Sequence, residues 1–200
     1  MARDYSFMRF ANKEDRIELC LERKIRKSGY AGFISSKYFE ELIVIFVNDT
    51  LLDEYCIRGG YISVQEDGTH PKIILDTATF NDIKRGVATA RFLLFHEIGH
   101  YFCGHFAEKS TLEDEFHKRN LHLKSYEVST DEVEADCFGA EFLGAEYAIG
   151  ALQDAMEQRM INDLLCGTLE NDASQMAMRE YQLRIDAVQE RFGLYQKDKE

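Results

Sequence analysis

Residues 91–106, RFLLFHEIGHYFCGHF, place three histidines and a glutamate within a run of large apolar side chains. Unpaired ionisable groups are costly to bury, so this segment folds only where something satisfies His96, Glu97 and His100. On a helix His96 and His100 lie about 40° apart on one face, and two imidazoles so placed can reach one metal ion. Glu97, offset by about 100°, borders that ion without competing for it. The spacing therefore predicts a buried helix that binds a metal.

A bound zinc ion would lower the pKa of a water molecule to roughly 7 and polarise a carbonyl group. Glu97 is then placed to take the proton of that water as a general base. The alternative is a helix with capped or core histidines, because a bare HExxH also occurs by chance. The apolar neighbours FLLF and YF favour the metal, since one ion satisfies all the buried groups together.

A catalytic zinc site needs three protein ligands and one open position. The metzincin pattern HExxHxxGxxH does not supply the third, because Cys103 and Phe106 stand where it needs Gly and His. Gly104 and His105 are each one residue out of register. The third ligand is therefore expected from another part of the chain.

The downstream segment STDEVEADCFGAEFLGAEYA, residues 129–148, predicts a second helix with Ser129 or Thr130 as its N-cap. Helical spacing from Glu132 gives a mostly small or apolar face, formed by Ala135, Asp136, Gly139, Phe142 and Leu143. A carboxylate at the head of an apolar face is the one buried against the first helix. Glu132 is therefore the predicted third ligand; the alternative is an acid favoured only by the helix dipole.

Several neighbours of these residues have weaker predicted roles. Asp136 is placed to accept the N–H of a ligand histidine and fix its tautomer. Glu134 is the fallback ligand, although with Glu141 it falls on the opposite, solvated side of the helix. Cys103 is more typical of a packed core thiol than of a ligand. His105 is rotated away from the metal face and is expected to contact a neighbouring helix or the rim of a substrate site.

Zinc peptidase mechanisms also use a His or Tyr to donate a hydrogen bond to the developing oxyanion. The sequence does not choose among the candidates, which are Tyr101, His117, His122, Tyr126 and Tyr181. The ligand types also leave manganese and iron open beside zinc.

The composition fits one globular domain of 200 residues, of which 45% are hydrophobic. A formal charge of −12 argues against direct nucleic-acid binding, which needs a basic face. The five cysteines are scattered without a CxxC pair, which favours a reducing cytoplasm over a disulfide framework. Neither a signal peptide nor a membrane-spanning run is found, so we expect no membrane association and a cytoplasmic location.

The expected fold class is α+β, with a small mixed sheet packed on the HExxH helix, a second ligand-bearing helix and a helical C-terminal extension. Apolar residues at helical spacing predict an N-terminal helix from Asn12 to Gly29. Residues 41–49 predict either a strand or part of a helix capped at Ser35 or Ser36.

Residues 59–76 predict two strands joined by a loop at Asp67-Gly68, with Pro71 at the entry to the second. Four further helices are expected, and they cover residues 82–107, 129–147, 150–167 and 172–192, with a polar connection at 109–129. The single domain then divides into a helix and small sheet (1–80), metal-site helices (81–147), C-terminal helices (148–192) and a frayed tail (193–200).

The segment FLLFHEIGHYFCGH, followed by EVEADCFGAEFL, resembles the ImmA/IrrE-type metallopeptidases, which are small gluzincin-like zinc enzymes. Their signatures read approximately HExGH…H and ExxA/C-N/D-x-F-A-A-E-x-L. The matching residues are His96, Glu97, Gly99 and His100 in the first, and Glu132, Ala135, Asp136, Phe138, Ala140, Glu141 and Leu143 in the second. Gly139 replaces the usual alanine, a mild departure on a packed face.

The resemblance covers residues 55–145 and implies a zincin-like fold. It implies Zn²⁺ bound by His96, His100 and Glu132, with Glu97 as the catalytic residue. It also implies that the strand KIILD, just before the active helix, is an edge strand that pairs with an extended substrate.

The family implies limited proteolysis of a helix-turn-helix repressor in mobile-element or stress control. Many members carry a DNA-binding module, which the sequence here lacks. The alternative is a non-catalytic zincin-fold protein that binds or sequesters a protein partner, as the acidic charge and C-terminal helices suggest. A structural zinc site is disfavoured, because such sites are closed by four ligands, mostly Cys and His; Cys103 on the metal would revive it.

Overall fold

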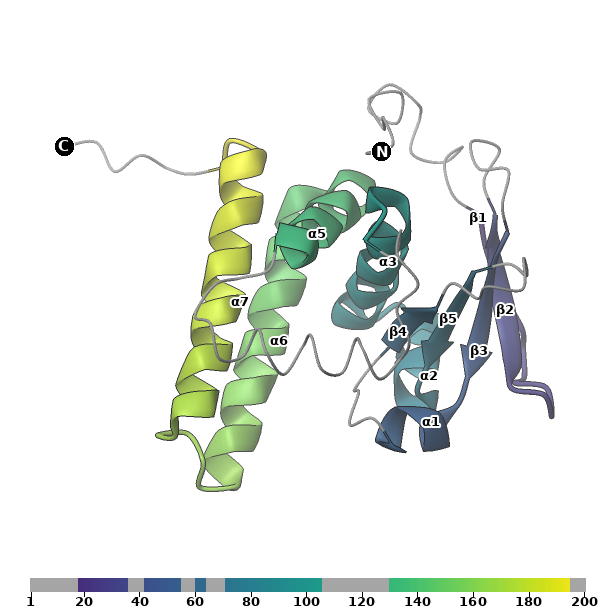
Figure 1. Ribbon diagram of the computed structural model, residues 1–200, viewed down its shortest axis with the longest axis horizontal. Coiled ribbons are helices and arrows are strands. Elements are labelled where there is room, and N and C mark those ends of the chain that lie inside the picture. Colours follow the sequence, from purple (N-terminus) through teal and green to yellow (C-terminus); the bar gives the residue numbers. More distant parts are fainter. Residues whose placement is uncertain (1–17, 36–41, 55–59, 64–70, 106–129, 195–200) are drawn as a thin grey trace.

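The computed structural model describes residues 18–35, 42–54, 60–63, 71–105 and 130–194. These residues form a mixed α+β fold, in which a five-stranded sheet lies at one end and helices lie to one side of it (Figure 1). The predicted α+β class is therefore confirmed. The loop at Asp67-Gly68, the polar connection at 109–129 and residues 195–200 of the predicted tail lie outside the described residues.

The sheet has the strand order β1-β2-β3-β5-β4. Its strands are β1 (Glu18–Leu21), β2 (Tyr30–Ser35), β3 (Ile43–Val47), β4 (Gly60–Ser63) and β5 (Lys72–Leu75). Strands β3 and β5 are parallel, and the other neighbouring pairs are antiparallel. The two strands predicted within 59–76 are confirmed as β4 and β5.

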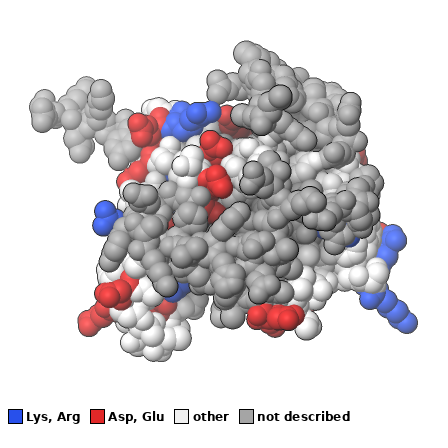
Figure 2. Space-filling view, in the orientation of Figure 1, with Lys and Arg blue, Asp and Glu red and all other residues white. Residues whose placement is uncertain are grey.

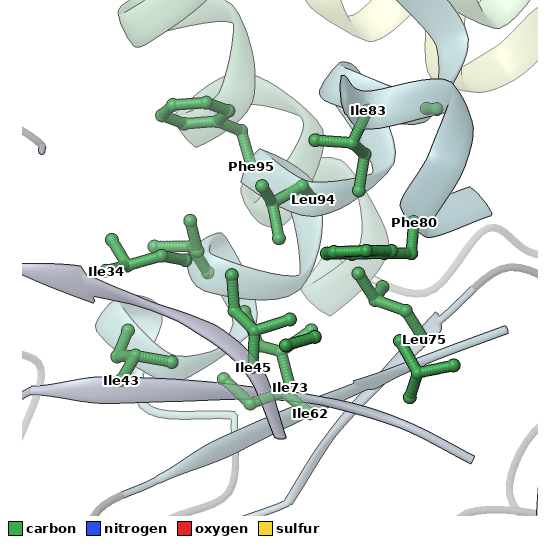
Figure 3. Packing of buried hydrophobic residues seen from close by; sticks show 14 of the residues in the cluster. Ile34, Ile43, Ile45, Ile62, Ile73, Leu75, Phe80, Ile83, Leu94 and Phe95 are labelled. Atoms are coloured by element: carbon green, nitrogen blue, oxygen red, sulfur yellow. The ribbon is translucent and has the colours of Figure 1, made fainter. Parts of the chain in front are cut away.

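The segment 41–49, for which the sequence left a strand and a helix open, contains strand β3 in its described part. Its residues alternate between buried and half-buried, as expected for a strand with one face on the core. Figure 3 shows Ile45 and Ile73 of the sheet facing Phe80 and Leu94, which come from the helices. Full burial of each such side chain contributes about 1.5–3 kcal/mol. This core fixes the HExxH helix to the sheet.

The described helices are α1 (Asp49–Glu54), α2 (Thr77–Arg85), α3 (Ala88–Cys103), α5 (Thr130–Leu143), α6 (Ala145–Leu165) and α7 (Asp172–Arg191). Helix α3 lies between the sheet and the α5–α7 group, and α6 and α7 run side by side (Figure 1). The helix predicted over 172–192 is confirmed as α7, which the Asn171 side chain caps by accepting the N–H of Ser174.

The predicted bounds of three helices are wrong, and two glycines at positive φ explain where the chain is divided. The helix expected over 82–107 is divided because Gly86, at φ 79°, ends α2 and donates its N–H to Asp82 and Ile83 carbonyls. The helix expected over 129–147 ends at Leu143, because Gly144 has φ 101°. Helix α6 therefore begins at Ala145 rather than near residue 150.

The predicted N-terminal helix over 12–29 is also wrong within the described residues. Residues 18–21 form β1, which pairs antiparallel with β2, and Gly29 at φ 84° lies in the turn before β2. Leu19 and Leu21, two residues apart, pack against the sheet core. The helical spacing of the other apolar residues is thus overridden by pairing with a strand that follows later in the chain.

The exposed surface agrees with the acidic composition. Figure 2 shows several groups of acidic side chains on one face, while the Lys and Arg side chains described there stay apart from one another. None of the helices in the described ranges is long and apolar enough to cross a membrane.

Candidate metal centre

Helix α3 carries its histidines inside the protein because it is buried on both sides. Leu94 and Ile98 belong to the core against the sheet, whereas Phe92 belongs to a second core formed with α6 and α7. His96 and His100 are each only 5% exposed, and Glu97 is 2% exposed. The prediction of a buried helix across the HExxH segment is confirmed.

Gly99 allows α5 to lie directly against α3. A Cβ at this position would lie 2.9 Å from the Cα and from the carbonyl oxygen of Ala135, and 3.1 Å from the Cβ of Phe138. Only glycine leaves room for this approach without displacing backbone atoms. The close contact brings the first turn of α5, and with it Glu132, beside the two histidines.

Three side chains converge where α3 and α5 meet. His96 Nε2 lies 3.2 Å from Glu132 Oε2, His100 Nε2 lies 3.5 Å from Glu132 Oε1, and the two Nε2 atoms are 3.0 Å apart. Ligands about 2.0–2.1 Å from a tetrahedral zinc ion are about 3.3–3.4 Å from one another. The three side chains therefore fit one zinc ion with little movement. Since 25% of the Glu132 side chain is exposed, the cluster is open to solvent on one side.

Asp136 orients His96 from behind. The Nδ1 of His96 lies 2.8 Å from Asp136 Oδ1, so its N–H donates there and Nε2 is left facing the cluster. The Asp136 carboxylate is fully buried and also accepts two hydrogen bonds from Arg184, at 2.6 Å and 2.7 Å. Arg184 Nη1 lies 3.7 Å from Glu132. The predicted contact of Asp136 with a ligand histidine is thus present.

Arg184, on α7, is a site residue that the sequence reasoning missed. It is seven residues after Ala177 and one before Ile185, both of which are buried, so it falls on the inner face of α7. A charged residue at such a position indicates that a buried carboxylate lies on another helix. The sequence pattern does not identify the carboxylate that pairs with Arg184, because Asp136 is 48 residues away in the chain.

The electrostatics of this cluster favour a positive charge at the ligand atoms. Burial alone lowers the pKa of His96, but hydrogen bonds and charges from Asp136 and Glu132 outweigh it and raise the pKa to about 9. Burial raises the pKa of Asp136, yet Arg184 overcomes this and holds it below its usual value. Hydrogen bonds from both histidines likewise outweigh burial and lower the pKa of Glu132 well below normal.

Glu97 makes a hydrogen bond with the sheet through one carboxylate oxygen. The backbone N–H of Ile62, on β4, donates to Glu97 Oε2 at 3.2 Å. A Cβ at Gly60 would lie 2.8 Å from Leu75 Cδ2 and at an ordinary contact distance of 3.8 Å from Glu97 Cγ, so this end of β4 borders the Glu97 side chain. The predicted catalytic carboxylate therefore lies between the metal-site helix and β4.

The strand KIILD is not an edge strand, which corrects that expectation. β5 is paired on one side with β3 and on the other with β4, so β4 is the edge on this side of the described sheet, and β1 is the edge on the other. The reason is the parallel β3–β5 pairing, which places β5 inside the sheet and leaves β4 outside. The strand that borders Glu97 is thus one of the two edge strands among the described residues.

The weaker candidates take other positions. Cys103 Sγ lies 4.0 Å from the Glu134 carbonyl oxygen, and burial, with the charge of Glu134, raises its pKa to about 12. Glu134, the fallback ligand, contacts His105 instead of the histidine pair. His105 thereby contacts a neighbouring helix, as predicted, but it also reaches His100 and is not set apart from the site.

The oxyanion donor stays a prediction. Tyr101 lies edge-on to Phe102, and Tyr181 lies under the guanidinium of Arg184. His117, His122 and Tyr126 lie outside the described residues. No family model, curated protein or solved structure matches the chain, so membership of a family remains the prediction made from its motifs.

Proposed function

We propose that the chain is a zinc-dependent endopeptidase of the ImmA/IrrE type with a zincin-like fold. The observation that carries the proposal is the convergence of His96, His100 and Glu132 at zinc-ligand spacing on a partly exposed cluster. Three ligands with one open side suit a catalytic ion better than a structural one. Cys103 is grouped with His105 and Glu134 rather than with this cluster, which weakens the structural alternative.

In this proposal His96, His100 and Glu132 hold the ion, and Asp136 with Arg184 keeps His96 in the ligating tautomer. Bound zinc supplies a Lewis acid that acidifies a water molecule and polarises the scissile carbonyl. Glu97 would serve as the general base, taking a proton from water on a carboxylate oxygen and passing it to the leaving nitrogen. Among the described strands β4 is paired on one side only, which would give an extended peptide a strand to pair with beside Glu97.

The substrate we propose is a specific cytoplasmic protein, a helix-turn-helix repressor by the family resemblance, and the reaction is limited proteolysis. A buried, structured site beside β4, an edge strand among the described residues, suits one extended segment of a protein better than a small molecule. We propose no direct contact with nucleic acid, since the formal charge is −12.

Replacing Glu97 by Gln tests the mechanism. Gln keeps an oxygen that accepts the Ile62 N–H but cannot act as a general base, so zinc binding should be retained and cleavage lost. Zinc-loaded wild type and Glu97→Gln are incubated with a proteome-derived peptide library, and new N-termini are identified by mass spectrometry. Equal cleavage by both proteins would refute the mechanism.

The alternative function, a non-catalytic partner-binding protein, has one observation in its favour. The end of α6 exposes large apolar side chains, namely Met160, Ile161, Leu164 and Leu165. Exposed apolar groups of this kind are typical of interaction surfaces. If the wild type yields no new N-termini and Glu97→Gln retains the full biological effect, the binding function replaces the peptidase.

A further inference from the structure

His105 connects a ligand histidine to the protein surface. Its Nδ1 lies 2.8 Å from His100 Nδ1, and its Nε2 lies 3.1 Å from Glu134 Oε2 on α5. The side chain of His105 is only 7% exposed, whereas that of Glu134 is 56% exposed. A continuous series of polar contacts therefore runs outward from the metal cluster.

The turn after α3 makes this contact possible. Gly104 adopts φ 80° and ends the helix, and the backbone N–H of His105 then donates to the carbonyl of His100 at 3.1 Å. The left-handed residue folds the chain back, so His105 lies against His100 although its helical register points elsewhere. Because of this turn, helical spacing alone wrongly places the His105 side chain away from His100.

The positions of the protons follow from the contacts. Two ring nitrogens 2.8 Å apart share one proton, because one must donate and the other accept. When His100 uses the lone pair of Nε2 to bind a metal, its neutral ring carries the proton on Nδ1. His105 must then accept at Nδ1 and carry its own proton on Nε2. That N–H faces the carboxylate of Glu134, which only accepts when ionised.

We propose that His105 and Glu134 are positioning residues that hold His100 in the tautomer whose Nε2 binds the metal. The inference rests on the metal site of the proposed function, but not on peptide hydrolysis. Both ligand histidines are then anchored at Nδ1: His96 directly by Asp136, and His100 by a second imidazole backed by a carboxylate.

The competing interpretation is a second metal site. The ligand atoms of Cys103, His105 and Glu134 lie within 4.8 Å of one another, and Asp131 Oδ1 is 3.9 Å from His105 Nε2. A metal on His105 Nε2 would leave the proton of that neutral ring on Nδ1. It would face the Nδ1 proton of a metal-bound His100 across 2.8 Å, with no acceptor between them. The geometry therefore favours one metal and a hydrogen-bonded series.

Two substitutions of His105 separate orientation from simple packing. His105→Leu fills the space but removes the acceptor, whereas the side-chain oxygen of His105→Asn can replace Nδ1. Loss of such a supporting contact typically costs about 10–100-fold in metal affinity. We expect His105→Leu to bind zinc about 10–100-fold more weakly than the wild type and His105→Asn to recover most of that loss. Equal loss in both would indicate packing alone and overturn the proposal.

Glu134→Ala serves as the test if His105→Leu does not fold. The Glu134 side chain is largely exposed, so its replacement should not disturb folding. We expect it to weaken zinc binding, while the matched control Glu157→Ala, an exposed acid on α6, should leave it unchanged. Zinc affinity is measured by chelator competition on the full chain, with circular dichroism of the metal-free variants as the folding control. Wild-type affinity in Glu134→Ala and in folded His105→Leu would contradict the inference.

Long-range ¹H–¹⁵N correlation spectra of the zinc-loaded protein read the tautomers directly. We expect one bound zinc, with the proton on Nδ1 of His100 and on Nε2 of His105. A second zinc that is lost in Cys103→Ala or His105→Leu would overturn the proposal in favour of the two-metal interpretation. Zinc binding and tautomers as expected, but without any peptide cleavage, would uphold this inference while the peptidase function fails.

Discussion

Replacing Gly99 by Ala tests whether the close approach of α3 and α5 creates the metal site. The added Cβ would lie 2.9 Å from the Cα and the carbonyl oxygen of Ala135 and 3.1 Å from the Cβ of Phe138. These atoms belong to the backbone or to the base of a side chain, so no change of rotamer relieves the contact. Helix α5 must therefore move away from α3.

The size of the effect follows from these distances. Nonbonded carbons attract best at about 3.5–4.0 Å, so α5 must move by about 0.6 Å or more. Metal–ligand distances tolerate only about 0.2 Å, and Glu132 lies on α5 one turn before Ala135. We expect zinc affinity to fall about 10–100-fold, as when supporting groups are lost. Overpacking should lower the free energy of unfolding by about 1–3 kcal/mol. The higher helix propensity of Ala offsets about 1 kcal/mol of that loss.

The assay is a zinc dissociation constant measured by chelator competition. Gly150→Ala is the matched control, because a Cβ at this α6 position would meet nothing within 4 Å. It should leave zinc affinity unchanged and stabilise the fold by about 0.5–1 kcal/mol. Gly139→Ala is a milder variant, since its Cβ would lie 3.0 Å from the Phe92 ring, whose side chain can shift, and at an ordinary 3.7 Å from the backbone nitrogen of His96. Wild-type zinc affinity in a folded Gly99→Ala protein would refute the reasoning.

Two further predictions concern the charges behind the cluster. Arg184→Met should lower the free energy of unfolding by about 3–5 kcal/mol in urea melts, because it leaves the buried Asp136 carboxylate without its guanidinium partner. Adding Asp136→Asn should restore part of that loss; a loss below about 1 kcal/mol would contradict a buried ion pair. In the metal-free protein, the raised pKa of His96 stabilises the fold fully below its ordinary value of 6.5 and progressively less as the pH rises through about 9. Urea melts between these pH values should show stability falling with pH, and a flat profile would contradict the shift.

The ligand-bearing helices were predictable because their evidence is local. His96 and His100 are related by helical spacing alone, and Glu132 heads a face whose small residues indicate helix packing. Gly99 belongs to the same local pattern, although its role becomes clear only where it meets Ala135. Helical spacing within each of the two helices, α3 and α5, was enough to select the residues of the candidate site.

Contacts between distant segments were not predictable in the same way. Residues 18–21 have apolar neighbours at helical spacing, yet pairing with β2 makes them a strand. Which of β4 and β5 is the edge depends on the parallel partner β3, which no short pattern specifies. Arg184 reaches Asp136 only after α7 has packed on α5. In each case the partner lies outside the window that a local pattern can read.

Charge balance gives a reason for an arginine beside a cluster that we propose to bind a cation. Glu132 and Asp136 bring two buried or half-buried negative charges, and Arg184 offsets one of them. A single positive charge at the ligand atoms then balances the cluster, and a proton on His96 can supply it in the metal-free protein. A divalent ion would instead leave one positive charge in excess, which the carboxylate of Glu97, the residue after His96 on α3, would offset in part. Arg184 thus makes the cluster neutral without metal and electron-poor with it, the condition that favours loss of a proton from a bound water.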